Sequence, residues 1–290
     1  MSQPGEMTAV LGLIAKDVPV DQETVDVAVM MDLTGSMSNE INAMGNKMVD
    51  VFDTLRAKHP MKRFRIGFVG YRDYDVSDKE RFIVIDFTDN ITDVKEIIRS
   101  LEAKGGDDGA EDVAGGFQHI NGLSWNATAV RQVLFVADAP AHGMNYHDDT
   151  ISDNYPDGDP SEINLDDQMA LMASKQIGFT VFRMNSCNDK MNGVLRAAYQ
   201  RGKQERGPGA TSKATFIVAD VAQQLAVAKA REMYSDDGFY GYERSGVEDI
   251  DDEIDRGDDC VNRSLSEAVI ETSDSIMYTQ LLSAVSSQLD

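Results

Sequence analysis

The sequence predicts a doubly wound α/β domain: a mostly parallel sheet with one antiparallel edge strand and helices on both faces. Apolar runs that suit strands alternate with amphipathic segments that suit helices over most of the chain. Two of those runs, over 25–31 and 133–137, have little polar interruption. Runs of this kind are typical of parallel strands that helices cover on both faces, so these two should lie near the centre of the sheet.

The first half of the chain begins with the strand over 25–31 and continues with a helix over 41–55. Apolar residues at spacings of three and four predict that helix: Ile41, Met44, Met48, Val51 and Leu55. Strands over 65–71 and 81–87 follow, joined by a polar turn over 72–79. Because a parallel crossover needs about a dozen residues or more, this short connection predicts an antiparallel pair with one strand at the sheet edge.

The second half of the chain continues the same alternation. Helices are predicted over 92–101 and 111–120, separated by a glycine-rich loop. After the strand that ends before Asp138, a polar loop runs to about residue 160. The remaining elements are a helix carrying Leu165, Met169 and Met172, a strand over 177–182, a helix over 190–199, a strand over 214–219 and a helix over 221–233. Regular alternation of strand and helix predicts a doubly wound sheet.

The domain organisation predicted from the sequence is an N-terminal extension over 1–22, one domain over 23–233 and an acidic C-terminal tail over 234–290. Carboxylates are densest over 248–255. Apolar residues within 265–289 allow two interpretations. One is a single helix that packs on the domain or on a partner, and the other is a disordered, solvated tail.

The composition excludes several classes of protein. The chain has 290 residues and a formal net charge of −23, and a phosphate backbone would be repelled by that charge, so we expect no nucleic-acid partner. No segment approaches the roughly 18 to 20 apolar residues that a membrane span needs, and the N-terminus lacks the basic start of a signal peptide. The sequence therefore predicts a cytoplasmic protein, in which Cys187 and Cys260 are free thiols.

Oxygen-bearing side chains follow the two most apolar strands. Asp32, Thr34 and Ser36 come directly after the strand over 25–31, and Asp138 follows the strand over 133–137. The carboxyl ends of parallel strands form one edge of the sheet, where binding crevices lie in open α/β folds. Carboxylate and hydroxyl oxygens are the hard ligands that Mg²⁺ prefers. An alternative interpretation of the first motif is that Asp32 caps the following helix.

Four motifs give the chain a family resemblance. They are Asp32-Leu-Thr-Gly-Ser-Met37, Gly105-Gly-Asp-Asp-Gly-Ala-Glu-Asp-Val113, Ala137-Asp-Ala-Pro-Ala-His-Gly143, and Tyr146-His147 followed by Asn154-Tyr-Pro-Asp-Gly-Asp-Pro160. Over 25–233 the chain resembles a von Willebrand factor A domain, and it looks most like the type attached to α-kinases. The resemblance implies a Rossmann-like fold with a metal-ion-dependent adhesion site that binds Mg²⁺ or Mn²⁺.

The resemblance also implies a set of metal ligands. Asp32, Thr34, Ser36 and Asp138 would contribute from two loops. Many such domains have a threonine ligand in the middle loop, which is absent here between residues 104 and 113.

The spacing of Asp108 and Glu111 instead looks like the middle loop of integrin β I-like domains. This makes Glu111 the preferred ligand and Asp108 the competitor. Asn39 and Glu40 together suggest a second, Ca²⁺ site, although the helix dipole also explains an acidic residue in a first turn.

The predicted function is a cation-dependent protein-interaction module whose bound ion accepts an Asp or Glu carboxylate from a protein partner, within a basic patch of that partner. Two alternatives remain. A metal-dependent hydrolase or phosphoryl-transfer enzyme would use His142, although His142 and His147 lack a recognisable carboxylate partner in the sequence. A regulatory or scaffold subunit would use the ion only for stability. The sequence contains no recognisable kinase or nucleotide-binding motif, so kinase activity is not predicted.

Overall fold

The computed structural model describes residues 23–206, 214–221 and 267–289. Its six strands are β1 (Glu23–Asp32), β2 (Lys62–Tyr71), β3 (Phe82–Thr88), β4 (Val130–Ala137), β5 (Gly178–Arg183) and β6 (Phe216–Asp220). Its α-helices are α1 (Ser38–Lys58), α2 (Asp78–Arg81), α3 (Ile91–Arg99), α4 (Val113–Gly122), α5 (Leu165–Ser174), α6 (Asp189–Glu205) and α9 (Glu267–Leu289), and a 3-10 turn covers Gly35–Met37. The predicted helix over 221–233 falls almost wholly outside the described residues.

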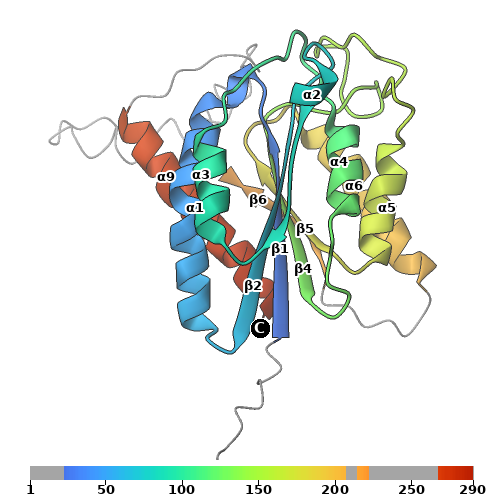
Figure 1. Ribbon diagram of the computed structural model, residues 1–290. Helices are drawn as coiled ribbons and strands as arrows, with labels where there is room; N and C mark the ends of the chain where they lie inside the picture. The colour runs from blue at the N-terminus through green and yellow to red at the C-terminus, as the bar shows by residue number, and fades with distance from the viewer. Residues whose placement is uncertain (1–22, 207–213, 222–266, 290) are drawn as a thin grey trace, which may run out of the picture.

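The six strands form one sheet in the order β3-β2-β1-β4-β5-β6. All neighbouring pairs are parallel except β2 and β3, which are antiparallel, so β3 is the antiparallel edge strand. Helices α1, α3 and α9 cover one face of the sheet, and α4, α5 and α6 cover the other (Figure 1). The predicted fold class is confirmed.

The run of apolar residues in β1 is long because both faces of this central strand are buried. Asp26 interrupts it, and this buried carboxylate pairs with Arg65 at 2.7 Å. Val27, Val29 and Met31 belong to the core under α1, α3 and α9, whereas Ala28 and Met30 belong to the core under α4, α5 and α6. Alternate side chains of a strand point to opposite faces, so a strand between two helical layers is apolar at most of its positions.

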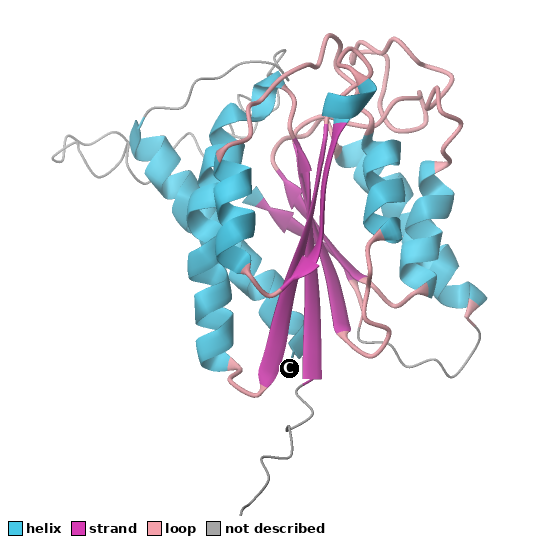
Figure 2. Ribbon diagram, in the orientation of Figure 1, coloured by secondary structure: helices cyan, strands magenta, loops and turns pink. Residues whose placement is uncertain are grey.

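The strand order places a crevice beside the predicted ligands. The chain runs from β1 outward to β2 and β3, and then returns to the other side of β1 for β4, β5 and β6. The reversal lies between β1 and β4, and ligands of open α/β sheets bind outside the carboxyl ends of the strands at such a point. Long loops gather at this end of the sheet, opposite the end where β1 begins (Figure 2). Every helix in the described part of the chain is too short or too polar to cross a membrane.

Candidate metal centre

The loops after β1 and β4 bring four of the predicted ligands together. Asp32 is the last residue of β1 and is fully buried, and its Oδ1 accepts hydrogen bonds from Thr34 N at 2.8 Å and Thr34 Oγ1 at 2.7 Å. Ser36 Oγ donates to Asp138 Oδ1 at 3.0 Å and lies 3.5 Å from Thr34 Oγ1. Because β1 and β4 are neighbouring parallel strands, Ser36 and Asp138 meet at one edge of the sheet although they are 102 positions apart in the sequence.

Glu111 reaches the same place from the loop before α4. The residue is 3% exposed, and its Oε2 has no hydrogen-bond partner. Gly106 has a φ of +90°, and a Cβ at that position would lie 2.9 Å from Glu111 Oε1 and 3.2 Å from Thr34 Cβ. A residue with a side chain would therefore be strained there and would collide with the carboxylate. The glycine lets the middle loop approach Thr34 closely enough to bring Glu111 beside it.

Asp108 lies in the same middle loop but has occupied oxygens. Its Oδ1 accepts from Ala110 N at 3.2 Å, and its Oδ2 accepts from Asn154 N at 2.6 Å. A carboxylate with a buried, unpartnered oxygen is the better ligand because it has most to gain from a cation. This difference favours Glu111 over Asp108 as the direct ligand of the middle loop.

A cavity of about 330 Å³ joins these three loops. The predicted ligands in its wall are Thr34, Ser36, Asp108, Glu111 and Asp138. Asp32 lies behind them, with a buried Oδ2 that has no hydrogen-bond partner. No lysine or arginine of the described residues lines the cavity. The described wall of the cavity thus carries several carboxylates and no basic side chain.

The carboxyl pKa values reflect this imbalance. Burial, with repulsion from Asp138, raises the pKa of Asp32 to about 8 despite the hydrogen bonds from Thr34. Burial, with repulsion from Asp32, raises the pKa of Glu111 to about 11, and burial also raises the pKa of Asp138. Carboxylates in a cluster repel one another when they are ionised, and a bound divalent cation would stabilise their ionised form.

The residues present fit a hard divalent cation. Two hydroxyls and several carboxylates supply only oxygen ligands, and two buried carboxylate oxygens, Asp32 Oδ2 and Glu111 Oε2, have no hydrogen-bond partner among the described residues. Oxygen-only ligand sets suit Mg²⁺, Mn²⁺ or Ca²⁺ rather than softer metals. The cap interpretation of Asp32 is not supported, since the carboxylate bonds Thr34 at the end of the strand and the 3-10 turn begins at Gly35 without a side-chain cap.

Tyr71 also lies at the centre, although the sequence analysis did not single it out. Tyr71 ends β2 directly beside Asp32, and its fully buried hydroxyl has no hydrogen-bond partner. Burial and the nearby Asp32 and Glu111 carboxylates raise the Tyr71 pKa well above its usual value. The signal in the sequence was the position of Tyr71, since it ends a strand at the same sheet edge as Asp32.

Of the two residues predicted for a second ion, Asn39 is exposed and Glu40 is half-buried in the first turn of α1. Burial, offset in part by a backbone hydrogen bond, raises the pKa of Glu40 to about 7. Glu40 Oε2 has no hydrogen-bond partner. A second ion near Glu40 therefore stays a prediction.

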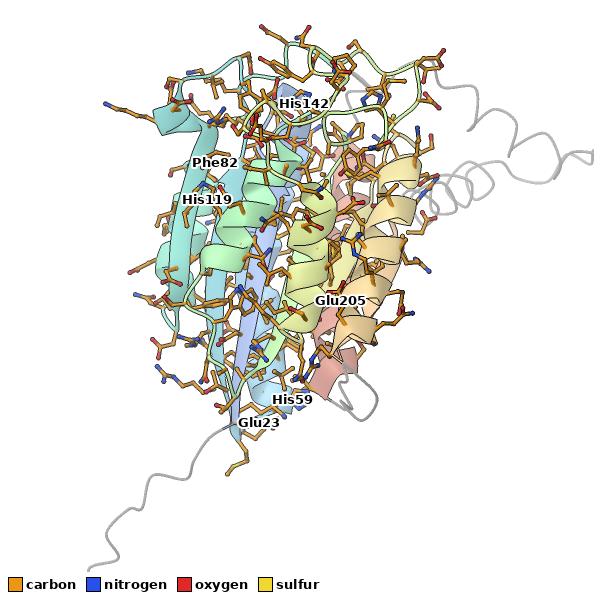
Figure 3. All side chains as sticks on the ribbon, turned by 90° about the vertical axis from the view of Figure 1, so that its right-hand side faces the viewer. Glu23, His59, Phe82, His119, His142 and Glu205 are labelled. Carbon is orange, nitrogen blue, oxygen red and sulfur yellow. The ribbon has the colours of Figure 1, made fainter. Side chains whose placement is uncertain are left out.

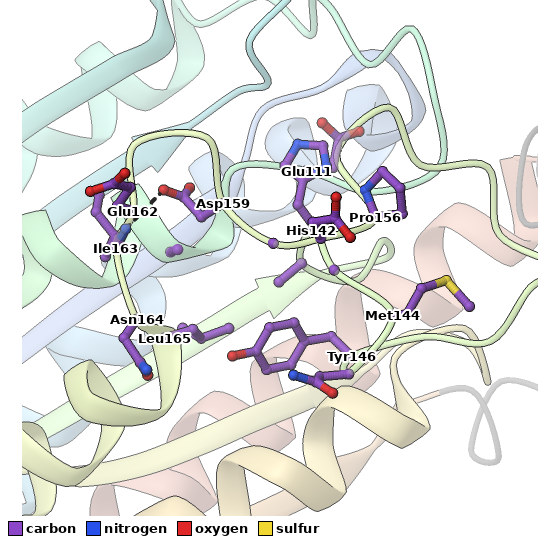
Figure 4. A pocket seen from close by; sticks show the side chains of 16 residues that line it. Glu111, His142, Met144, Tyr146, Pro156, Asp159, Glu162, Ile163, Asn164 and Leu165 are labelled. Atoms are coloured by element: carbon purple, nitrogen blue, oxygen red, sulfur yellow. Dashed lines mark hydrogen bonds between the residues drawn. The ribbon is translucent and has the colours of Figure 1, made fainter.

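A second cavity, of about 530 Å³, lies on the other side of Glu111, in the long loop after β4. Figure 4 shows Glu111 and His142 in its wall, together with Tyr146 and Asp159. His142 is 2% exposed and contacts Asp73 and Asp153, and His147 contacts Asp153. Burial lowers the pKa of His142, but hydrogen bonds to Asp73 and Asp153 outweigh it and raise the value to about 9. The histidines thus have the carboxylate partners that the sequence did not reveal.

Cys187 lies in the wall of the first cavity and is disulfide-bonded. The prediction of a free thiol is therefore wrong for this residue. Cys260, the other cysteine of the sequence, lies outside the described residues.

Residues 26–154 match the family model of the von Willebrand factor A domain. Over 163 residues, 56% of this chain, the sequence is 34% identical to alpha-protein kinase vwkA of Dictyostelium discoideum. The matched part of this chain spans 26% of the length of that kinase.

Two solved structures are similar at low sequence identity. The pilus adhesin SpaC from Lactobacillus rhamnosus GG, in its open conformation, has a TM-score of 0.46 and 11% identity, over 70% of this chain and 28% of that one. The conserved hypothetical protein BatB from Bacteroides thetaiotaomicron has a TM-score of 0.41 and 11% identity, over 73% of this chain and 100% of that one.

Proposed function

Because this chain contains a von Willebrand factor A domain, as its motifs predicted, we propose that it is a divalent-cation-dependent protein-interaction module. The observation that carries the proposal is the pair of buried, unpartnered carboxylate oxygens, Asp32 Oδ2 and Glu111 Oε2, beside a cavity with no lysine or arginine in its described wall. Burying ionisable groups without a counter-charge is costly, and a bound cation would remove that cost.

Each residue would contribute to coordination of the ion in a different way. Thr34 and Ser36 would offer hydroxyl oxygens, Glu111 would offer a carboxylate, and Asp32 and Asp138 would bind directly or through water. A bound Mg²⁺ or Mn²⁺ would supply a positive centre with exchangeable waters, one of which a partner's carboxylate could replace. Ser36 is exposed, so this replacement would take place on the solvent side of the cavity.

We propose that the partner presents its Asp or Glu within a basic patch. The chain has a formal net charge of −23, so the field around the centre is negative and would repel an acidic side chain on its own. Basic residues around the partner's carboxylate would offset this repulsion and raise the association rate. Association should therefore weaken as the salt concentration rises.

The test is calorimetry of the metal-stripped full chain with Mn²⁺ and Mg²⁺. We expect saturable binding that Ser36→Ala weakens by roughly tenfold or more, because a direct ligand is lost. The control is Ser38→Ala, whose hydroxyl is exposed, donates to Gly35 O at 3.3 Å and lies outside the cavity. Glu111→Gln and Asp108→Asn identify the ligand of the middle loop, and we expect the larger loss from Glu111→Gln.

Carboxylate binding is then tested with glutarate as a probe for an acidic side chain. Displacement of water from protein-bound Mn²⁺ should lower the water-proton relaxation rate as glutarate is added. Ion binding that stabilises the protein but leaves the relaxation rate unchanged would contradict the interaction module and support a purely structural ion. Absence of ion binding in the wild-type protein would contradict both.

We propose no enzymatic activity for this chain. The Dictyostelium relative is named a kinase, but the match covers only 26% of that protein. A hydrolase or phosphoryl-transfer enzyme stays an alternative, and metal-dependent turnover lost in His142→Asn would support it.

A cytoplasmic location also stays a prediction. The disulfide at Cys187 argues against it, because disulfides persist mainly in oxidising compartments. Thiol labelling of the protein taken directly from cells would decide this point.

A further inference from the structure

Three side chains of the described residues form a group with metal-ligating geometry beside the cation cavity. Asp108, His142 and Asp153 each offer one ligand atom, and all three atoms lie within 4.8 Å of one another. The side chains of His142 and Asp153 are 1% and 2% exposed. Asp108 comes from the middle loop, whereas His142 and Asp153 come from the long loop after β4. His142 lies at the loop end of the molecule, far from Glu23 and His59 (Figure 3).

The imidazole of His142 lies between two carboxylates. Its Nε2 is 2.7 Å from Asp73 Oδ1, and its Nδ1 is 2.8 Å from Asp153 Oδ1. An ionised carboxylate only accepts hydrogen bonds. A proton or a metal ion must therefore lie between each ring nitrogen and the carboxylate that it contacts. A proton on Nε2 satisfies the contact with Asp73. The lone pair of Nδ1 then faces Asp153, and either a second proton or a metal ion must mediate that contact.

We propose that His142 Nδ1, Asp153 and Asp108 form a second metal site, selective for Zn²⁺ or a similar transition metal. The imidazole nitrogen distinguishes this site from the oxygen-only centre, because imidazole suits Zn²⁺ whereas Mg²⁺ prefers oxygen. In a tetrahedral site, two ligands with bonds of about 2.0–2.1 Å to one metal lie about 3.3 Å apart. His142 Nδ1 and Asp153 Oδ1 are 2.8 Å apart, so the two side chains would separate by about half an ångström to admit the metal.

Surrounding groups hold each ligand in place. Asp73 accepts from the outer nitrogen of His142, which is the arrangement of carboxylate, histidine and metal found around bound zinc. Asp153 accepts from Gly143 N at 2.7 Å and Tyr155 N at 2.7 Å. Asp108 accepts from Asn154 N and Ala110 N. Backbone donors therefore hold both carboxylates in position beside His142.

His147 supports the site without belonging to it. Its Nε2 lies 2.9 Å from Asp153 Oδ2, the oxygen that does not face His142, and its Nδ1 lies 2.8 Å from the carbonyl oxygen of Asp148. His147 thus orients the Asp153 carboxylate from the opposite side. Since a metal at His142 Nδ1 replaces a proton there, binding should release protons.

The site would link the two loops that border the cation cavity. Asp108 is three residues from Glu111, and His142 is four residues from Asp138. A metal bound by Asp108 and His142 would hold these loops together and fix the width of the cavity. The inference stands apart from the proposed function, since it requires no bound Mg²⁺ and no partner.

The test is a titration of the metal-stripped full chain with Zn²⁺ in the presence of excess Mg²⁺, followed by calorimetry in two buffers of different ionisation enthalpy. We expect one equivalent of Zn²⁺ and a buffer-dependent heat that reports proton release. His142→Asn should abolish this binding, and Asp73→Asn should weaken it by roughly 10- to 100-fold. His59→Asn is the control and should leave Zn²⁺ affinity unchanged, because His59 lies at the opposite end of the molecule from His142 (Figure 3).

Co²⁺ provides an independent readout, because its visible absorption should change when imidazole nitrogen coordinates it and should not change in His142→Asn. If His142→Asn does not fold by circular dichroism, Asp108→Asn replaces it, since Asp108 is only half-buried and lies on a loop. Failure of the wild-type protein to bind Zn²⁺ under excess Mg²⁺, or equal binding by the folded variants, would overturn the inference. Either result would leave the Mg²⁺ experiments above unaffected.

Discussion

Tyr71 is a single residue near the centre whose surroundings bear on the stability of the fold. Its hydroxyl is fully buried and has no hydrogen-bond partner, although Asp32 lies directly beside it on β1. Buried hydroxyls normally have a partner, and an unpartnered one costs free energy of folding. If the centre binds a cation, water held by that ion would supply the partner, and Tyr71 would then connect the stability of the fold to occupancy of the centre.

We predict that Tyr71→Phe leaves the metal-free protein as stable as the wild type or stabilises it by about 1 kcal/mol, because an unpartnered buried hydroxyl is removed. The matched control is Tyr199→Phe. The Tyr199 hydroxyl is buried too but donates to Ile177 O at 2.8 Å, so its loss should destabilise the protein by about 1–3 kcal/mol. Urea unfolding without metal measures both, and equal losses in the two variants would contradict the prediction.

At the scale of elements, α9 lies far from the sheet in sequence but packs against α1 in space (Figure 1). Leu281, Ala284 and Val285 are buried in the same apolar core as β1 and α1. The hydroxyls of Tyr278 and Thr54 are 2.9 Å apart and link the two helices. The sequence left a docked helix and a disordered tail as alternatives, and the helix is the state that the structure describes.

We predict that Leu281→Ala lowers the free energy of unfolding by about 2–5 kcal/mol, because it leaves a cavity between α9 and the rest of the core. Ser283→Ala, at an exposed position two residues away, is the control and should change stability by no more than about 0.5 kcal/mol. The measurement is chemical denaturation followed by circular dichroism. If Leu281→Ala unfolds like the wild type, α9 does not contribute to the stability of the domain.

At the scale of the whole molecule, the carboxylates at the sheet edge oppose folding when they are ionised. A carboxyl group whose pKa is raised by folding stabilises the folded state at low pH, and that contribution is lost as the pH rises through the folded-state pKa. The pKa of Asp32 is raised to about 8 and that of Glu111 to about 11. Both shifts have the same sign, so their effects on stability add.

We therefore predict that the stability of the metal-free protein falls as the pH rises from about 5 to 8, and that saturating Mg²⁺ reverses much of this fall. The affinity for Mg²⁺ should rise over the same range, since protons no longer compete for the carboxylates. Urea unfolding at several pH values with and without Mg²⁺ measures both effects. In Asp32→Asn the fall with pH should be smaller, and an identical pH dependence would argue against Asp32 as its source.

Much of the architecture could be predicted from the sequence because local patterns decide it. The apolar run of β1 requires burial on both faces, and the short connection between β2 and β3 requires an antiparallel pair. The ligand motif after β1 could be located for the same reason, since a strand that ends in Asp32 delivers its side chains to the sheet edge. These are properties of neighbouring residues, which periodicity and loop length describe well.

Only the tertiary structure decided which distant side chains meet. The sequence determined that Asp32, Thr34 and Ser36 come at the end of one strand or just after it, and that Asp138 follows another. It left Asp108 and Glu111 as competitors and gave His142 no carboxylate partner. Folding supplies Asp73 and Asp153 to His142 and leaves Glu111 Oε2 without a hydrogen bond. The physical reason is that burial and hydrogen bonding depend on contacts between loops far apart in the chain, which no local pattern encodes.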